Sequence, residues 1–263
     1  MKLTETQLQR LCQITEAAGR AVMEVYAQDF VSWQKDDASP LTEADLRADA
    51  VIREGLERAF SGVYILSEES RSAGMNATET FFLVDPLDGT KEFLKKNGEF
   101  TVNIALVHQG MPVAGVVLAP ALGQLFYAAQ GLGAWMRDAT GLTALQVGRW
   151  DRSRALRVIG SRSHGGDAMQ GWLSRLPCDY AFLAAGSSLK FCRIAQGEAD
   201  IYPRLAPTSQ WDTAAAQCVL EVAGGAVVDL AGQRLRYGLE RPVLNPEFVA
   251  LGDPALLALL RPV

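Results

Sequence analysis

The sequence has few cysteines, and they are scattered. Cys12, Cys178, Cys192 and Cys218 lie in separate apolar segments, and no two of them form a C-x-x-C pair. This spacing excludes a disulfide framework and gives no sign of a structural zinc site. We expect buried, reduced thiols.

Long apolar runs are also missing. No stretch approaches the roughly 20 apolar residues of a membrane span, and the start, MKLTETQLQR, lacks the apolar core of a signal peptide. We therefore expect a cytoplasmic protein without integral membrane association, although peripheral attachment to the inner membrane stays open. Whether the chain is a monomer or a homodimer is open as well.

Neither a basic surface nor a histidine nucleophile is indicated. The formal net charge is −5, which argues against binding of a nucleic acid polymer but leaves room for a small anionic substrate held by local cations. The two histidines, His108 and His164, stand beside no serine-aspartate arrangement.

What is present is a globular chain in two differently patterned halves. Residues 4–26 and 41–60 read as amphipathic helices, the first burying Leu8, Leu11, Thr15, Ala18, Val22 and Val25, the second Leu46, Ala50, Leu56 and Phe60. Short apolar runs then predict strands that pair antiparallel, at 63–66, 81–84, 100–107, 112–120 and 124–130. After about residue 152 strand-like and helix-like segments alternate.

This pattern predicts a layered α+β or α/β sandwich. We expect residues 1–151 to form an N-terminal subdomain with an antiparallel sheet, its helices and the metal motifs. Residues 152–263 would form a smaller α/β subdomain with the substrate-binding segments and Asp212.

Acidic residues stand at the ends of several apolar runs. Burying such charges without compensation is unfavourable, and carboxylates are the ligands that Mg²⁺ prefers. The candidates are Asp45, Glu68 with Glu69, Asp85 with Asp88, and Asp212. Each has an ordinary alternative: a helix cap at Thr42-x-x-Asp45, a solvated loop at 68–70, a β-turn at 85–89, and a first helical turn at Asp212.

The segment VDPLDGTKEF, residues 84–93, has the clearest chemistry. Pro86 fixes one φ angle, so the chain can turn and direct Asp85, the Leu87 carbonyl and Asp88 toward one volume. Gly89 and Thr90 would open a short helix over 90–96, and helix N-terminal amides bind phosphate. Metal and phosphate would then meet at one corner.

Glu68-Glu69, DPLDGT and WDTAAA, in this order and after SPLTEAD, resemble the motifs of the inositol monophosphatase-like superfamily of Mg²⁺-dependent, lithium-sensitive phosphatases. The resemblance runs over nearly the whole chain and implies an αβαβα sandwich. GSRSH at 160–164 and GSSLKFCRIAQGEADIYPR at 186–204 resemble the CysQ-type 3′(2′),5′-bisphosphate nucleotidases within it. The implied reaction is hydrolysis of adenosine 3′,5′-bisphosphate to AMP and phosphate, as part of sulfur assimilation.

The resemblance also implies roles for the acids. Two or three Mg²⁺ ions are expected: one on Glu68, Asp85 and the Leu87 carbonyl, one on Asp85, Asp88 and Asp212, and a weaker third near Glu68. Asp45 and Thr90 would form a hydrogen-bonded pair that draws a proton from the attacking water, with Glu68 counted among the catalytic residues.

A bisphosphate substrate needs a second anion site. Ser187, Ser188 and Lys190 are the candidates for it, and Gly186 would let the backbone approach the sugar. The other expected substrate contacts are Gly89, Thr90, Arg162, His164 and Asp212. Arg162 and Lys190 can also be read as solvated surface charges.

The substrate stays open between three readings. Phosphatases that act on inositol phosphates usually carry a glutamate seven residues before the aspartate of the tryptophan-aspartate pair, and Leu205 stands there in this chain. This favours the nucleotide. An inositol or sugar phosphatase of the same fold and a non-catalytic nucleotide sensor are the alternatives.

Overall fold

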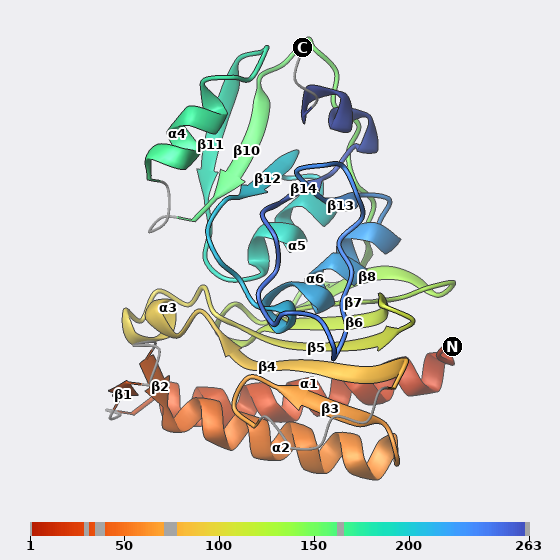
Figure 1. Ribbon diagram of the computed structural model, residues 1–263. Coiled ribbons are helices and arrows are strands. Elements are labelled where there is room, and N and C mark those ends of the chain that lie inside the picture. Colours follow the sequence, from red (N-terminus) through yellow and green to blue (C-terminus); the bar gives the residue numbers. More distant parts are fainter. Residues whose placement is uncertain (1, 29–31, 35–39, 71–77, 162–165, 261–263) are drawn as a thin grey trace.

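The fold is a stack of five layers, helix, sheet, helix, sheet and helix (Figure 1). The computed structural model describes residues 2–28, 32–34, 40–70, 78–161 and 166–260. Two core clusters lie on either side of a seven-stranded sheet, and a third lies outside a five-stranded sheet. The predicted αβαβα sandwich is thus confirmed.

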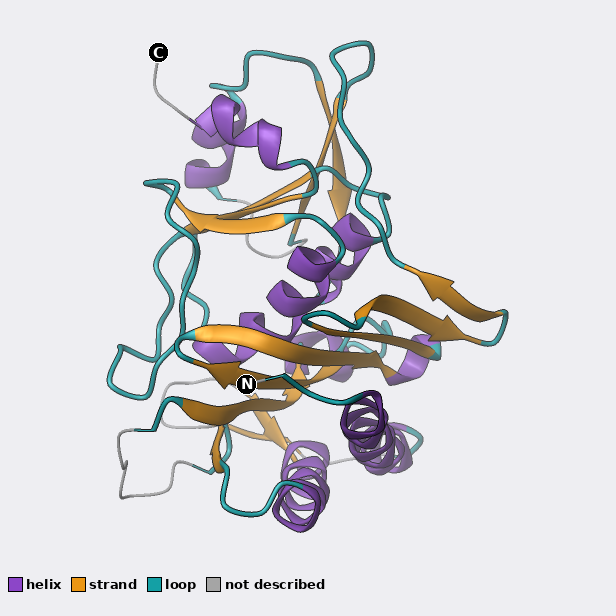
Figure 2. Cartoon of the chain, turned by 90° about the vertical axis from the view of Figure 1, so that its right-hand side faces the viewer, coloured by secondary structure: helices purple, strands orange, loops and turns teal. Residues whose placement is uncertain are grey.

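The first layer is a pair of helices, seen end-on at the bottom of Figure 2. Helix α1 (Glu5–Tyr26) starts at a capping box formed by Thr4 and Gln7, and it buries the whole predicted stripe. Helix α2 (Glu43–Ala59) buries only part of the predicted stripe: Leu56 and the C-cap residue Phe60 are buried as expected, whereas the first half of the helix buries a different face. Ala44, Ala48, Ile52 and Leu56 are buried, whereas Leu46 is 48% exposed and Ala50 is exposed. Small residues at four-residue spacing let α2 approach α1 and the sheet closely, which a search for large apolar side chains overlooks.

The second layer is the seven-stranded sheet, in the order β3-β4-β5-β6-β7-β8-β9. Its strands are β3 (Tyr64–Ser67), β4 (Thr80–Asp88), β5 (Thr101–His108), β6 (Met111–Ala119), β7 (Gln124–Ala129), β8 (Gly133–Asp138) and β9 (Gly141–Ala144). A single 3₁₀ turn (Pro120–Leu122) separates β6 from β7. The expectation of a wholly antiparallel sheet is wrong at one edge, because β3 and β4 are parallel. Both therefore end at the same side of the sheet, where Glu68 and Asp85 follow.

A β-bulge near the end of β4 decides where its acids point. Asp85 pairs with Asn103 and Asp88 with Thr101, so three steps on β4 match two on β5. In a regular strand, residues three apart face opposite sides of the sheet. The extra residue restores Asp88 to the side of Asp85 and turns Leu87 into the core beneath, with Phe82 and Val84. Pro86, which lacks an N–H, is suited to this break in the ladder.

The third layer lies between the sheets and carries one of the acids. It consists of α5 (Leu189–Ala195) and α6 (Gln210–Val222), whose apolar side chains belong to the core shared by both sheets. At the closest approach α6 lies against β6, where a Cβ on Gly115 would fall 2.2 Å from the Ala215 carbonyl oxygen. The absence of a side chain at Gly115 thus sets the depth at which α6, and with it Asp212, is held.

The fourth layer is a mixed five-stranded sheet in the order β11-β10-β12-β14-β13. Its strands are β10 (Leu156–Gly160), β11 (Tyr180–Ala184), β12 (Ile201–Arg204), β13 (Ala226–Asp229) and β14 (Phe248–Leu251). The outer layer comprises α4 (Asp167–Leu173) and a 3₁₀ segment (Pro254–Leu260). A two-stranded ribbon, β1 (Ser32–Gln34) with β2 (Pro40–Thr42), and the short α3 (Thr90–Leu94) complete the chain.

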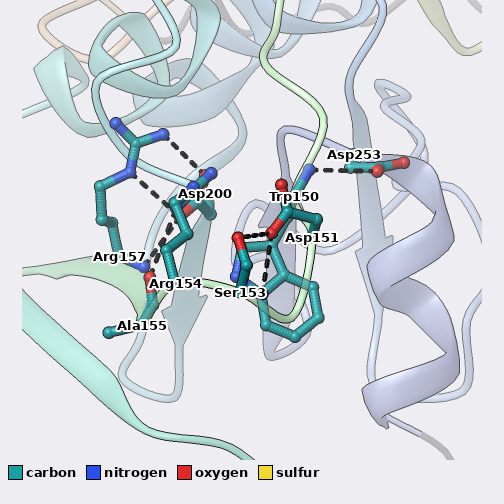
Figure 3. Close-up of polar contacts among 8 residues, drawn as sticks. All are labelled: Trp150, Asp151, Ser153, Arg154, Ala155, Arg157, Asp200 and Asp253. Carbon is teal, nitrogen blue, oxygen red and sulfur yellow. Dashed lines mark hydrogen bonds and ion pairs between the residues drawn. The ribbon is translucent and has the colours of Figure 1, made fainter.

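A buried carboxylate fixes β12 against β10. Asp200 accepts hydrogen bonds from Arg154 at 2.6 Å and 2.8 Å and from Arg157 at 2.8 Å and 3.1 Å (Figure 3). Burial alone would raise the pKa of Asp200, but these hydrogen bonds outweigh it and lower the pKa to about 2. The carboxylate is therefore ionised and paired.

The cysteines match the expectation of free thiols, with one difference. Cys12, Cys192 and Cys218 are buried, whereas Cys178 is partly exposed. None of the helices in the described part of the chain combines the length and apolar character needed to cross a membrane.

The predicted division at residues 151 and 152 remains a prediction. Helix α6 belongs to the second half by sequence, yet it packs on the sheet of the first half through a continuous core.

Gly115→Ala should lower the free energy of unfolding by about 1–3 kcal/mol, because the added methyl overlaps the α6 backbone. Urea unfolding measures the effect. Gly171→Ala on α4 is the matched control, since its Cβ would meet nothing within 4 Å and alanine favours a helix. Equal stability of the two variants would contradict the tight contact.

Candidate metal and phosphate site

Three segments from two layers bring their carboxylates together. One oxygen each from Glu68, Asp85 and Asp212 lie within 4.8 Å of one another. Glu68 follows β3, Asp85 lies on β4 and Asp212 on the first turn of α6. Residues separated by more than 120 positions in the sequence thus form a single acidic cluster.

Glu68 is held against Asp85 by the parallel strand pair. Ser67 pairs with Val84, and the Glu68 N–H donates to the Val84 carbonyl at 3.1 Å. The neighbouring Glu69, a less definite candidate in the sequence, continues the same turn. The backbone therefore brings Glu68 beside the residue that precedes Asp85.

Asp88 is fixed by groups from β5 and from the segment before α5. Its Oδ2 accepts the Ser188 N–H at 2.6 Å and the Thr101 hydroxyl at 3.4 Å. The Ser188 hydroxyl in turn donates to Asn103 at 2.8 Å. We expected the hydroxyl and the amide of Ser188 to contact substrate. Both instead form hydrogen bonds within the protein.

Asp45 and Asp212 are both third residues of a helix that begins with a capping box. Asp45 accepts the Thr42 N–H at 2.8 Å and the Thr42 hydroxyl at 2.7 Å, and Asp212 accepts the Ser209 N–H at 2.8 Å. The cap interpretation is correct for Asp45 and the first-turn interpretation for Asp212. Both are compatible with a site role, because a carboxylate has lone pairs for further partners.

Thr90 lies beside the bulge. Its hydroxyl donates to the Leu87 carbonyl oxygen, the expected metal ligand, at 3.3 Å. Asp45 is close enough for its charge to raise the pKa of Asp85. A hydrogen bond between Asp45 and Thr90 remains a prediction.

Burial and mutual repulsion dominate the electrostatics of the cluster. Burial, followed by the charges of Glu68, Asp88 and Asp212, raises the pKa of Asp85 well above its usual range. Burial and the charge of Asp88 do the same for Asp212. The pKa of Asp88 rises to about 6, because burial outweighs the opposing effects of Lys190 and the Ser188 N–H.

The acids form one wall of a cleft of about 330 Å³. Gly89, with φ of 89°, lies on its rim as the N-cap of α3, as expected. Close packing requires glycine at position 186, which the sequence did not reveal. A Cβ there would fall 2.6 Å from the Glu99 carbonyl oxygen. Whether it also approaches a sugar remains a prediction.

Two polar side chains in the cleft suit an anionic ligand. Ser187 is in the left-handed region at φ of 44°, and its Oγ has no hydrogen-bond partner among the described residues although it is buried. Lys190 is 5% exposed, and burial lowers its pKa to about 8 against the opposing charge of Asp88. Its Nζ donates to the Ser187 carbonyl at 2.5 Å.

Sequence reasoning missed Arg204. It lines the cleft at the end of β12, where its guanidinium donates to the carbonyls of Ala206 and Pro207 at 2.9 Å and 2.8 Å. A strand ending on a cation, in DIYPR, was the available signal. Arg162 and His164 lie outside the described residues, and Ser161 before them lines the cleft.

The donor set fits a hard divalent cation. Every acid in the cluster offers oxygen, and the neighbouring Leu87 carbonyl offers another. Burial and the neighbouring carboxylates raise the pKa of Asp85 and of Asp212, and a bound cation would offset both effects. Lys91, Lys190 and Arg204 are the cations that line the described cleft, and Lys190 is the one whose charge acts on Asp88.

Asp85→Asn should stabilise the metal-free protein at pH 8 while removing its response to Mg²⁺. A raised pKa in the folded state means that the stability gained by protonation is present below about pH 4 and is lost as pH rises through the folded value. Asparagine keeps the acceptor for the Leu87 N–H and removes the charge. We expect a melting temperature about 3–8 °C higher at pH 8, a gain that shrinks toward pH 4.

Scanning calorimetry with and without Mg²⁺ measures both effects. The charge-removing control is Asp138→Asn, at an exposed acid far from the cluster in sequence and outside the cleft lining. A variant that is less stable than the wild type at pH 8 would contradict the repulsion.

Known proteins are similar in sequence to nearly the whole of this chain. Residues 4–260 match the model of the inositol monophosphatase family. The 3′(2′),5′-bisphosphate nucleotidase CysQ of Salmonella typhimurium is 44% identical over 245 residues, covering 92% of this chain and 98% of the relative. The Escherichia coli K12 protein of the same name is 42% identical over 247 residues, with the same coverage.

A solved structure agrees with the sequence matches. CysQ from Bacteroides thetaiotaomicron, described as a bacterial member of the inositol monophosphatase family, superposes with a TM-score of 0.81 at 33% identity. The match covers 94% of this chain and 97% of that one. With its layers, its acidic cluster and these relatives in agreement, this chain belongs to the inositol monophosphatase family.

Proposed function

We propose that this protein is a Mg²⁺-dependent 3′(2′),5′-bisphosphate nucleotidase that hydrolyses adenosine 3′,5′-bisphosphate to AMP and phosphate. The observation that carries the proposal is the acidic cluster of Glu68, Asp85 and Asp212 on the wall of a cleft that also contains buried Lys190. The relatives named CysQ support the choice of substrate.

The carboxylates would hold two or three Mg²⁺ ions. We assign Glu68, Asp85 and the Leu87 carbonyl to one ion and Asp85, Asp88 and Asp212 to another, with a third near Glu68. Bound Mg²⁺ supplies positive charge to the transferring phosphoryl group and to the attacking and leaving oxygens. The chain's own contribution is to fix the carboxylates through caps, the bulge and the Ser188 amide before an ion arrives.

Thr90 and Asp45 are the proposed proton acceptors. The Thr90 hydroxyl, now donating to the Leu87 carbonyl, lies on the cleft wall, and Asp45 in the first turn of α2 lies close enough to Asp85 for their charges to interact. A hydroxyl can accept a proton from water on one side while donating its own to a carboxylate on the other. Glu68, in the same cleft, is also proposed as a catalytic residue.

Lys190, Ser187 and Arg204 are the proposed contacts for the phosphate that is not hydrolysed. The buried Ser187 hydroxyl has a free hydrogen-bonding capacity, and two cations are placed at the same side of the cleft. The charge of Arg204 helps to lower the pKa of Lys190, which shows that their fields overlap. A dianionic phosphate would relieve this repulsion.

An inositol phosphate is disfavoured by Leu205. This side chain is partly buried against the core outside the five-stranded sheet and offers no polar atom for a ring hydroxyl. A sugar phosphate and a purely sensory role remain the alternatives. Nucleotide binding in calorimetry without phosphate release would establish the sensor.

A substrate panel with Mg²⁺ tests the proposal. Phosphate release should be fastest with adenosine 3′,5′-bisphosphate, slower with inositol 1-phosphate and fructose 1,6-bisphosphate, and inhibited by Li⁺. Equal or faster turnover of inositol 1-phosphate would reject the nucleotide assignment and leave the family membership intact.

Arg204→Gln should raise KM for adenosine 3′,5′-bisphosphate about tenfold or more and leave KM for adenosine 3′-monophosphate within about twofold. Loss of one charge-assisted hydrogen bond is worth about 1.5–3 kcal/mol, and only the bisphosphate makes this contact. Steady-state kinetics on both substrates gives the comparison. Arg236→Gln, at an exposed arginine outside the cleft, is the control. Parallel losses on the two substrates would contradict the role.

A further inference from the structure

We propose that Asp49 and Arg53, on the second and third turns of α2, are positioning residues for Glu68. They hold Ser67 and Ser70, the two residues that flank Glu68 and Glu69. The proposal rests on the metal-binding role of Glu68 advanced above and adds the residues that determine where that carboxylate lies.

On the strand side of the turn, Asp49 supplies the helix contact. The fully buried Ser67 hydroxyl donates to Asp49 Oδ1 at 2.5 Å. The backbone of Ser67 is already paired with β4, and the Glu68 N–H donates to Val84. The residue before Glu68 is thus held by the sheet through its backbone and by α2 through its side chain.

On the far side, Asp49 and Arg53 hold Ser70 jointly. The Ser70 hydroxyl donates to Asp49 Oδ2 at 2.8 Å and accepts from Arg53 Nε at 2.5 Å. The Arg53 guanidinium also donates to the Ser70 carbonyl at 2.8 Å and to Asp49 at 3.2 Å. Backbone and side chain of Ser70 are therefore both engaged, and the turn between Ser67 and Ser70 is closed at both ends.

Burial shows that the arrangement is more than a surface ion pair. Asp49 is 7% exposed, and its partners come from the turn and from Arg53 of its own helix. A buried carboxylate that loses these partners is strongly destabilised, so the network keeps one geometry. Glu54 and Arg58 on the same helix form, by contrast, an exposed ion pair within α2 at 3.7 Å.

Helical spacing relates this network to the cleft. Asp45 and Asp49 are four residues apart and lie on the same face of α2. Asp45 lies close enough to Asp85 for their charges to interact, while Asp49 holds the turn that supplies Glu68. One helix face therefore sets two acids of the site, the first directly and the second through hydroxyl groups.

Metal affinity is the expected readout. Outer partners that orient a ligand typically change metal affinity or activity by 10–100-fold when removed. We expect Asp49→Ala to weaken Mn²⁺ binding, measured by calorimetry on the protein without substrate, by about tenfold or more. The apparent Mg²⁺ activation constant should rise similarly, and kcat should recover at saturating Mg²⁺.

Two further variants should weaken Mn²⁺ binding by smaller amounts than Asp49→Ala. Asp49→Asn retains an acceptor for Ser67 but offers an NH₂ group to Ser70 and Arg53, so its loss of affinity should be intermediate. Ser70→Ala removes one hydroxyl, leaves the pair of Asp49 and Arg53, and should weaken Mn²⁺ binding about threefold or more. This variant keeps the test available if Asp49→Ala does not fold.

Asp200→Ala is the matched control for a purely structural effect. Asp200 is also a buried aspartate with arginine partners, and it does not line the cleft. It should lower the melting temperature as Asp49→Ala does while leaving Mn²⁺ affinity within about twofold.

The outcomes separate the two proposals. If the wild type and Glu68→Gln bind Mn²⁺ equally, the assigned metal site is wrong. If Glu68→Gln loses affinity while folded Asp49→Ala and Ser70→Ala bind like the wild type, the metal site stands and the positioning role is rejected.

Discussion

The structure depends on a repulsion that the protein does not relieve by itself. Asp85 is buried among Glu68, Asp88 and Asp212, and burial with these charges raises its pKa. Folding must bring the four together against this unfavourable term, and the large cores on both sides of the sheet supply the stability to do so. The acids are held in place by apolar packing and by hydrogen bonds, and the missing positive charge defines what the site is suited to bind.

Geometry turns this repulsion into a site. The parallel pairing of β3 with β4 places Glu68, which follows β3, beside Asp85. A one-residue bulge in β4 brings Asp88 to the same face of the sheet. The close contact at Gly115 sets the depth of α6, which delivers Asp212 from the other half of the chain. Each device is a backbone feature, so the carboxylates need little side-chain adjustment when a ligand binds.

Much of this could be predicted from the sequence, and the failures have physical causes. Helix α1 follows from periodicity, since its large apolar residues face one core. The main strands follow from short apolar runs, whose residues face the two cores on either side of the sheet. The first half of the buried face of α2 was predicted wrongly, because Ala44 and Ala48 form it and Leu46 is exposed, whereas Leu56 and Phe60 are buried as predicted. Other features depend on long-range contacts that local patterns do not encode. They are the parallel pairing of β3, the bulge at Pro86, the strands β8, β9 and β14, and the hydrogen bond from the Ser188 N–H to Asp88. The motif residues were identified through the family resemblance, whereas Arg204, the last residue of the segment quoted at 186–204, was not singled out because its place in the cleft depends on the fold.

The paired capping boxes link the site to local unfolding. Asp45 and Asp212 each accept the N–H of the residue that starts their helix, so one carboxylate serves both the helix start and the cleft. Fraying of the first turn of α6 releases the Ser209 amide and moves Asp212 away from the cluster. Occupancy of the cleft and hydrogen exchange of that amide are then coupled by linkage. The rate of hydrogen exchange at the Ser209 amide thereby reports the occupancy of the cleft.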